Sequence, residues 1–210
     1  MFGDPVSNEH DFEKGTVRDI LESANYGTSA KAQVEGEYPY LRMNNITYEG
    51  EMDFESLKYI DLTEKEESKF LAQKGDVLFN RTNSKELVGK TGLFNSEAKM
   101  AIAGYLVRAR VNERANPYFL WGYMNSKHGK AVLRHMCKSI VGMANINAQE
   151  FQNIKIVIPP LEKQKSFANR VSEIERQKKI VRANRDKSDL LFNSLLQKAF
   201  KGELTSTKAA

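Results

Sequence analysis

Short stretches in which apolar and polar residues alternate dominate the chain from about residue 38 to residue 111. Alternation with a period of two is typical of strands that bury one face, and glycines or polar pairs separate the stretches. We therefore predict an all-β or curled-sheet region. Its strands are expected within the sequences YPYLRMNNIT, LKYIDL, DVLFNR, KTGLF and AIAGYLVRARV.

A shorter helical pattern precedes these strands. Val17, Ile20 and Leu21 have the spacing of one helical face, and Gly27 is placed to end a helix. The sequence thus predicts a short helix that is followed by a loop of small residues from Gly27 to Lys31.

A second helical region follows the strands, at residues 114–136. Asn116 is suited to cap a helix, Pro117 suits the first turn, and Gly129 interrupts the apolar pattern. We predict a helix pair or a kinked helix that packs on the sheet. The stretch NPYF resembles the Asn-Pro-Pro-aromatic motif of DNA adenine methyltransferases. Because Tyr118 replaces the second proline and capping accounts for every residue, we interpret NPYF as a helix start.

The last predicted helix is much longer, because residues 161–201 contain neither Gly nor Pro after a strand from Ile154 to Ile158. Ten positions in this helix alternate steps of four and three, and seven of the ten are apolar. A helix of this length spans about 60 Å, which predicts coiled-coil pairing with another helix. The positions hold Phe167, Val171, Ile174, Lys178, Val181, Arg185, Ser188, Phe192, Leu195 and Ala199.

The predicted fold class is therefore α+β. We expect a curled or mixed β-sheet domain with packed helices, followed by one long C-terminal coiled-coil helix. The predicted parts are an extended lead-in at residues 1–12, the domain at 13–160, the helix at 161–201 and a disordered tail at 202–210.

Charge is unevenly distributed along the chain, although the net charge is only +5. Residues 1–67 contain 6 Lys and Arg against 16 Asp and Glu, whereas residues 68–160 contain 14 against 5 and residues 161–204 contain 11 against 6. Charged blocks are often plain solvated faces. A segment that changes sign this sharply is nevertheless what a surface that faces a polyanion needs.

The residue types disfavour catalysis. Cys137 is the only cysteine, which excludes a disulfide framework, and His135 lies two residues away and cannot share a metal with it on a helix. The sequence contains no glycine-rich nucleotide loop and no nucleophile with an obvious base. We expect no catalytic residue, no metal and no bound cofactor. Without a leader or a membrane-length apolar run, the chain is expected to be cytoplasmic.

Two polar segments within the basic region suggest binding instead. Arg can pair with guanine, Asn with adenine, and Ser, Thr and Lys with phosphates, whereas Asn and Gly in a solvated loop can equally serve turns. The candidates in the first loop are Arg81, Thr82, Asn83, Ser84, Lys85 and Lys90. The second loop, at residues 138–149, adds Lys138, Asn145 and Asn147, and the small-residue loop adds Tyr26, Thr28, Ser29 and Lys31.

The stretches GDVLFNRTNSKELVGKTGLF, YPYLRMNNI, NIKIVIPPLEKQKSFANRVSEIE and LLQKAFKGEL resemble the DNA specificity (S) subunit of type I restriction-modification systems. The resemblance covers nearly the whole chain. It implies a target recognition domain that binds double-stranded DNA, and partners that are modification (methyltransferase) and restriction subunits. S-adenosylmethionine is expected on the modification subunit and not on this chain.

A full subunit of that family has two recognition domains and two long helices that pair antiparallel, whereas this chain has one of each. It resembles half of that plan, so a second half of a longer subunit, a truncated reading frame and a natural half-subunit are all open. The charged seam residues Lys178 and Arg185 would meet their own copies in a parallel pair. We therefore expect an antiparallel homodimer with the seam Phe167, Val171, Ile174, Val181, Phe192 and Leu195.

Two other functions compete with DNA reading. A coiled-coil scaffold whose domain binds protein would show no salt-dependent affinity for DNA. A stand-alone methyltransferase or nuclease would need a cofactor loop or a metal cluster that the sequence does not contain.

Overall fold

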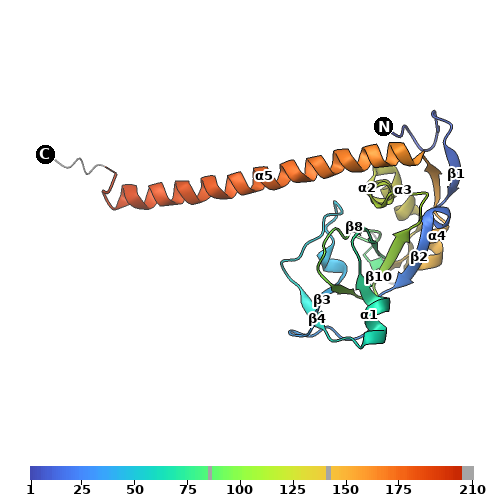
Figure 1. The fold of residues 1–210 in the computed structure, drawn as a ribbon, viewed down its shortest axis with the longest axis horizontal. Coiled ribbons are helices and arrows are strands. Elements are labelled where there is room, and N and C mark those ends of the chain that lie inside the picture. The colour runs from blue at the N-terminus through green and yellow to red at the C-terminus, as the bar shows by residue number, and fades with distance from the viewer. Residues whose placement is uncertain (85–86, 141–142, 205–210) are drawn as a thin grey trace. The chain divides into compact units, whose positions relative to one another are not determined.

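The computed structural model describes residues 1–84, 87–140 and 143–204, and it divides into two compact units (Figure 1). The first unit, Met1–Ala168, mixes strands and helices. The second unit, Asn169–Ala210, contains the greater part of one long helix. The predicted α+β class with a long C-terminal helix is confirmed. No helix within the described residues is long and apolar enough to cross a membrane.

A four-stranded antiparallel sheet forms the centre of the first unit, in the order β2 (Leu21–Tyr26), β10 (Leu106–Val111), β6 (Val77–Asn80), β8 (Thr91–Leu93). All four residues of β6 are buried, so both of its faces are covered. Val77 and Phe79 pack in the core cluster that includes the helices, while Leu78 packs in a second cluster on the other face. Alternate residues of one strand thereby join two layers.

The second layer is a sheet in the order β4 (Lys58–Ile60), β3 (Tyr38–Leu41), β9 (Met100–Ile102), β5 (Leu71–Ala72). Only the β3–β9 pair is parallel. The sequence predicted β9 and β10 as one strand, but the chain turns between them at residues 103–105. Helix α1 (Glu64–Phe70) was not predicted, although Thr63 and Glu66 form a capping box at its start.

Two small sheets complete the first unit. Strands β1 (Glu13–Thr16) and β13 (Lys155–Ile158) pair antiparallel. Strands β11 (Lys138–Ile140), β12 (Met143–Asn145) and β7 (Thr82–Asn83) form the other sheet. Thr82 and Asn83 of the first predicted polar loop and strands β11 and β12 of the second therefore belong to one sheet. The loop prediction for residues 138–149 is wrong, since helix α4 (Ala148–Gln152) follows the strands directly.

Helices α2 (Pro117–Asn125) and α3 (Lys127–Met136) lie next to each other in Figure 1. The predicted cap is confirmed, because the Asn116 side chain accepts a hydrogen bond from the Tyr118 amide at 3.0 Å. The break between the helices falls at Ser126 and not at Gly129. Ser126 caps α3 by accepting from the Gly129 amide, and Gly129 is buried between the two helices.

The short helix predicted at residues 17–21 is wrong. Val17–Ile20 forms one turn of 3-10 helix, in which Val17 and Ile20 are both buried, and Leu21 already begins β2. A spacing of three fits a 3-10 turn as well as an α-helix. Gly27 does not end a helix either. A Cβ atom there would lie 2.1 Å from the Ile102 carbonyl oxygen, so glycine permits a close backbone approach.

Helix α5 (Leu161–Phe200) is 40 residues long and begins where the sequence predicted. Its first two turns belong to the first unit. There Gln164 and Ala168 are buried, and the ring of Phe167 lies 5.2 Å from the ring of Phe2. In the second unit, the large apolar side chains of α5 from Ile174 onward are exposed. Pairing of this helix and the predicted boundaries of the parts stay predictions.

Candidate nucleic-acid interface

The candidate interface is organised around Arg81, which links the end of β6 to β7. The Arg81 amide donates to the Tyr105 carbonyl at 3.1 Å, and the Arg81 carbonyl accepts from the Ile146 amide at 2.9 Å. Both partners lie far along the chain from Arg81 and come from two different segments. The backbone at Arg81 is therefore fixed by tertiary structure and not by a local turn.

The guanidinium of Arg81 is held from three sides. Its Nε donates to the Gly104 carbonyl at 3.1 Å, and its Nη1 donates to Oδ1 of Asn145 at 3.1 Å. The Cζ atom lies 4.8 Å from the ring centroid of Tyr26, which is a cation–π contact. None of the ion pairs among the described residues includes Arg81. The guanidinium of Arg81 is therefore held in place, and no carboxylate of the described residues neutralises its charge.

Oδ1 of Asn145 accepts two hydrogen bonds. The second comes from the hydroxyl of Thr82 at 2.8 Å. Asn145 is exposed at the end of β12, and the β7–β12 pairing brings it opposite Thr82. Arg81, Thr82 and Asn145, which the sequence assigned to two different loops, thus form one hydrogen-bonded cluster.

A cavity of about 510 Å³ lies beside this cluster. Three cations, Lys31, Arg42 and Arg81, line it, and so do the tyrosines Tyr40 and Tyr105. None of its lining residues, all within the described part of the chain, is an Asp or Glu. A concave surface lined by cations without carboxylates favours an anionic ligand.

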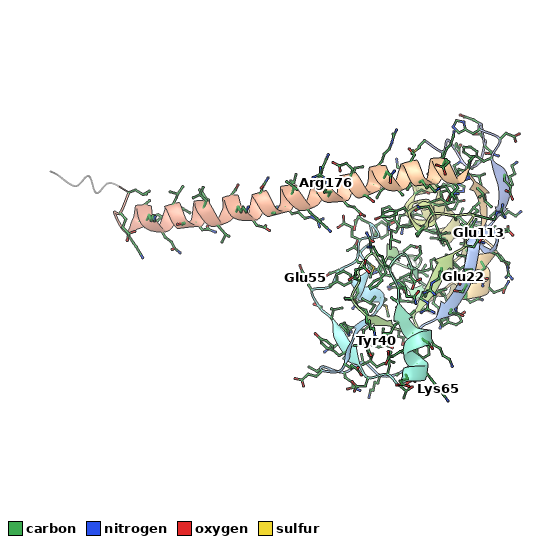
Figure 2. All side chains as sticks on the ribbon, in the orientation of Figure 1. Glu22, Tyr40, Glu55, Lys65, Glu113 and Arg176 are labelled. Carbon is green, nitrogen blue, oxygen red and sulfur yellow. The ribbon has the colours of Figure 1, made fainter. Side chains whose placement is uncertain are left out.

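The loop from Gly27 to Lys31 forms one wall of the cavity. Tyr40, labelled on β3 in Figure 2, donates its hydroxyl hydrogen to the Thr28 carbonyl at 2.7 Å. The Gly104 amide donates to the same carbonyl, also at 2.7 Å. Thr28 itself is buried, whereas Ser29 and Lys31 are exposed. The loop is consequently anchored at Thr28 and presents Ser29 and Lys31 outward.

Lys90 lies in the interior of the first unit. It is only 7% exposed, and its Nζ donates to the carbonyls of Met43 at 2.7 Å and Ile46 at 2.5 Å. Burial lowers the pKa of the Lys90 ammonium. These carbonyls lie in and just after the 3-10 helix Met43–Asn45, where a cation is favoured. Because its ammonium is engaged inside the unit, we leave Lys90 out of the interface.

The remaining predicted residues take varied positions. Asn147 caps α4 by accepting from the Glu150 amide at 2.9 Å, which is a structural role. Asn83 accepts from the Ser84 amide and donates to Sδ of Met43. Lys85 lies outside the described residues. The backbone of Lys138 pairs in β11, and its side chain is outside the described part of the structure.

Among the charged and aromatic residues that line the cavity, sequence reasoning missed three, namely Tyr40, Arg42 and Tyr105. Tyr40 and Arg42 looked like ordinary members of one alternating strand. Tyr105 follows Gly104 within the stretch that was predicted as a single strand. A Gly followed by an aromatic residue between two apolar runs was a turn signal that could have identified the 103–105 turn.

A second basic group surrounds Lys130 of α3. Its Nζ lies 5.1 Å from the ring centroid of Tyr48. The pKa of Lys130 is lowered to about 8, mainly by burial and to a smaller extent by the nearby charges of Lys90 and Arg134, while Glu49 acts in the opposite direction. The folded protein therefore holds this ammonium at a cost.

Lys130→Met is expected to raise the free energy of unfolding at pH 7 by about 1–2 kcal/mol. This figure is smaller than the full pKa shift would give, because solvent screens the half-buried Lys130. The pKa of Lys130 in the unfolded chain is about 10.4. Between pH 8 and that value the unfolded state binds more protons, so wild-type stability increases as pH rises. The difference between variant and wild type should therefore shrink between about pH 8 and pH 10.

Urea unfolding at a series of pH values measures this difference. The control is Lys127→Met, which changes an exposed lysine in the same helix and should shift stability by less than about 0.5 kcal/mol at every pH. A constant offset between Lys130→Met and wild type from pH 7 to pH 10 would show that Lys130 is not the titrating group.

The predicted helix seam is exposed from residue 174 onward. Ile174, Val181, Phe192 and Leu195 are between 44% and 66% exposed, while Val171 is half-buried. Phe167 differs from the others, because it packs against Phe2 within the first unit. We therefore leave Phe167 out of the pairing surface. The described residues contain no group of three or more His, Cys, Asp or Glu side chains that could hold a metal ion.

The family model and the curated relatives that this chain resembles all describe type I specificity proteins. The model of the type I restriction modification DNA specificity domain matches residues 9–188. The putative type I restriction enzyme MjaX specificity subunit of Methanocaldococcus jannaschii is 29% identical over 169 residues, which cover 79% of this chain and 40% of that protein. The type I restriction enzyme EcoKI specificity subunit of Escherichia coli is 28% identical over 208 residues, covering 93% of this chain and 44% of that protein.

Two solved structures share the fold. The HsdS subunit from Thermoanaerobacter tengcongensis has a TM-score of 0.54 at 19% identity, over 91% of this chain and 45% of that one. The type I restriction-modification S subunit from M. genitalium has a TM-score of 0.57 at 14% identity, over 95% of this chain and 47% of that one. The chain spans less than half the length of these relatives.

Proposed function

Because the chain belongs to the family of type I restriction modification DNA specificity domains, we propose that it reads one half of a bipartite double-stranded DNA target. Residues 13–160 contact the half-site, and the helix at 161–201 sets the spacing and offers a surface to modification subunits. The chain is non-catalytic in this proposal. S-adenosylmethionine binding, methylation and cleavage belong to the modification and restriction subunits, and the complex works in the cytoplasm, where the DNA lies.

One observation carries the proposal. The cluster of Arg81, Thr82 and Asn145 adjoins a cavity lined by cations without carboxylates. Positioned Arg and Asn side chains can contact base edges, and the flanking lysine and hydroxyl groups can contact phosphates. The basic excess of residues 68–160 adds a field that attracts a polyanion to this part of the chain.

We further propose that α5 pairs antiparallel with the same helix of a second copy, through Val171, Ile174, Val181, Phe192 and Leu195. Exposed apolar side chains along one helix support this pairing, because water disfavours such a surface. Lys178 and Arg185 would face their own copies in a parallel pair, whereas an antiparallel pair offsets them. Two identical domains related by a two-fold axis would read an interrupted palindrome.

Fluorescence energy transfer tests the pairing and its direction. An antiparallel pair that places Val171 opposite Leu195 also brings residues 169 and 197 together, and both are exposed and outside the seam. Cys137 is first replaced by Ser, and single cysteines at residues 169 and 197 are then labelled with donor or acceptor. Mixed dimers of the 169 and 197 variants should transfer energy strongly, and mixtures of donor-169 with acceptor-169 only weakly. Strong transfer in the 169–169 mixture would instead indicate a parallel pair, and a monomer in sedimentation would refute homodimerisation.

The test of DNA reading combines this chain with a type I modification subunit, S-adenosylmethionine and a library of randomised duplexes. Methylated adenines should map to an interrupted palindrome. Methylation at a non-palindromic bipartite site would mean that a second, different half completes the subunit. Co-purification of the two proteins without methylation would favour the scaffold function, which the exposed helix surface also fits.

A matched pair of variants tests the cavity in the same complex. Lys31→Ala removes a cavity cation and should weaken binding to all duplexes evenly, with a salt slope smaller by about one. Lys14→Ala removes an exposed cation on β1 that does not line this cavity, and it should leave affinity unchanged. Equal effects of the two changes would mean that charge attracts DNA without a defined contact at the cavity.

A further inference from the structure

The hydrogen-bonding capacity of Arg81 is only partly used within the unit. A guanidinium carries five N–H groups and no acceptor. One N–H on Nε donates to Gly104 and one on Nη1 donates to Asn145, which leaves three. Arg81 is partly exposed, and it lines the cavity. The remaining N–H groups are consequently available to a ligand that offers acceptors.

Asn145 is restricted in the opposite way. Its Oδ1 accepts from both Arg81 and Thr82, and these two donors fix the orientation of the amide. Its exposed amide nitrogen is thus left as the side of the group that can face a ligand, and this nitrogen only donates. To read adenine, an asparagine must offer both its oxygen and its nitrogen to N6 and N7. Asn145 has no oxygen to spare for this pairing.

Arg81 and Asn145 together therefore present adjacent donors. In the major groove, guanine offers two neighbouring acceptors, O6 and N7. Adenine offers an acceptor beside a donor, thymine offers one acceptor beside a methyl group, and cytosine offers a donor. Donors placed side by side match guanine and leave each of the other bases with a mismatch.

We propose that Arg81 is a specificity-determining residue that pairs with O6 and N7 of a guanine in the major groove, and that Asn145 is the positioning residue that directs it. This inference rests on the proposed DNA reading and adds the base that is read. Tyr26 supports the same geometry by stacking below the guanidinium. A side chain held by a carbonyl, an amide and a ring loses little freedom on binding.

The experiment uses the complex and the randomised duplexes described above, with wild type, Arg81→Lys, Asn145→Ala and Asn145→Asp. Wild type should select a motif with a G·C pair in each half-site. Arg81→Lys keeps the charge but removes the planar fork. In wild type we expect guanine to be preferred over the other bases by a factor of about 5 to 150 at that position. In Arg81→Lys this factor should fall below about three, while the rest of the motif stays unchanged.

Asn145→Ala and Asn145→Asp provide a second test. Asn145→Ala removes the acceptor that orients Arg81 and should reduce the guanine preference. The carboxylate of Asn145→Asp can still accept from Arg81 and Thr82, so this variant should keep the preference, and thermal unfolding checks that both variants fold. Unchanged preference in a folded Asn145→Ala variant overturns the positioning role of Asn145 even if Arg81→Lys fails to fold.

The outcomes separate this inference from the proposed function. A wild-type complex that selects no sequence refutes DNA reading itself. A wild-type motif that Arg81→Lys leaves unchanged, or in which the relaxed position is an A·T pair, leaves DNA reading intact and overturns the guanine assignment. Asn83→Ala is the control, because Asn83 is engaged by Ser84 and Met43 and should not alter the same position.

Discussion

Asp76→Asn is expected to lower the free energy of unfolding by about 3–5 kcal/mol. Asp76 is 1% exposed, and its carboxylate accepts two hydrogen bonds from Arg110, at 2.9 and 3.0 Å. Arg108 is also buried, with its Nε 3.9 Å from the same carboxylate. Burial lowers the pKa of Arg108, and the charge of Asp76 counteracts that effect. Removing this negative charge would leave the buried Arg108 and the partly buried Arg110 without the carboxylate that both of them contact.

Urea unfolding monitored through Trp121 measures the effect of Asp76→Asn. The matched control is Glu97→Gln, which breaks the exposed ion pair with Lys74 and should cost less than about 1 kcal/mol. If Asp76→Asn and Glu97→Gln lower the free energy of unfolding by the same amount, then the buried ion pair of Asp76 stabilises the fold no more than an exposed pair does. A loss below about 1 kcal/mol for Asp76→Asn would mean that the two arginines find other partners or water.

Gln164→Leu is the second change for which we expect a large loss, about 3 kcal/mol. Gln164 is fully buried in the first turn of α5. Its Oε1 accepts from the Asn116 amide at 2.9 Å, and its Nε2 donates to the carbonyls of Pro159 at 2.7 Å and Arg114 at 3.2 Å. Leucine has a similar volume but would leave three backbone groups without a partner.

The comparison for Gln164→Leu is Lys165→Gln, one residue further along the helix. Lys165 is exposed and forms only an exposed pair with Glu162, so its replacement should cost less than about 0.5 kcal/mol. Amide hydrogen exchange at Asn116 adds a local measurement, because Gln164 accepts from that amide. Unchanged protection of the Asn116 amide in Gln164→Leu would show that water replaces the glutamine.

Local patterns were sufficient for the central strands and the long helix. Residues 77–80 alternate between two cores, and residues 161–200 lack helix breakers, so neighbouring residues alone specified both elements. Asn116 and Pro117 likewise identified the start of α2. These elements depend on interactions within a few residues, which one sequence contains in full.

The candidate site depends on pairings that one sequence does not contain. Asn145 lies 64 residues from Arg81, and only the β7–β12 pairing brings the two together. The sequence suggested Lys90 as a phosphate ligand because it is a lysine in a polar, basic segment. The two carbonyls that bind its ammonium lie 47 and 44 residues away along the chain. Its burial therefore could not be inferred from the local sequence.

The pairing of β1 with β13 places Glu13 opposite Ile158, at the two ends of the segment that carries every residue of the proposed interface. A stretch of chain that enters and leaves at one point can be exchanged as a cassette, since its replacement alters no other path of the backbone. Under the proposed function, exchange of this segment between two chains would change the DNA half-site that is read and would leave the helix α5 unchanged.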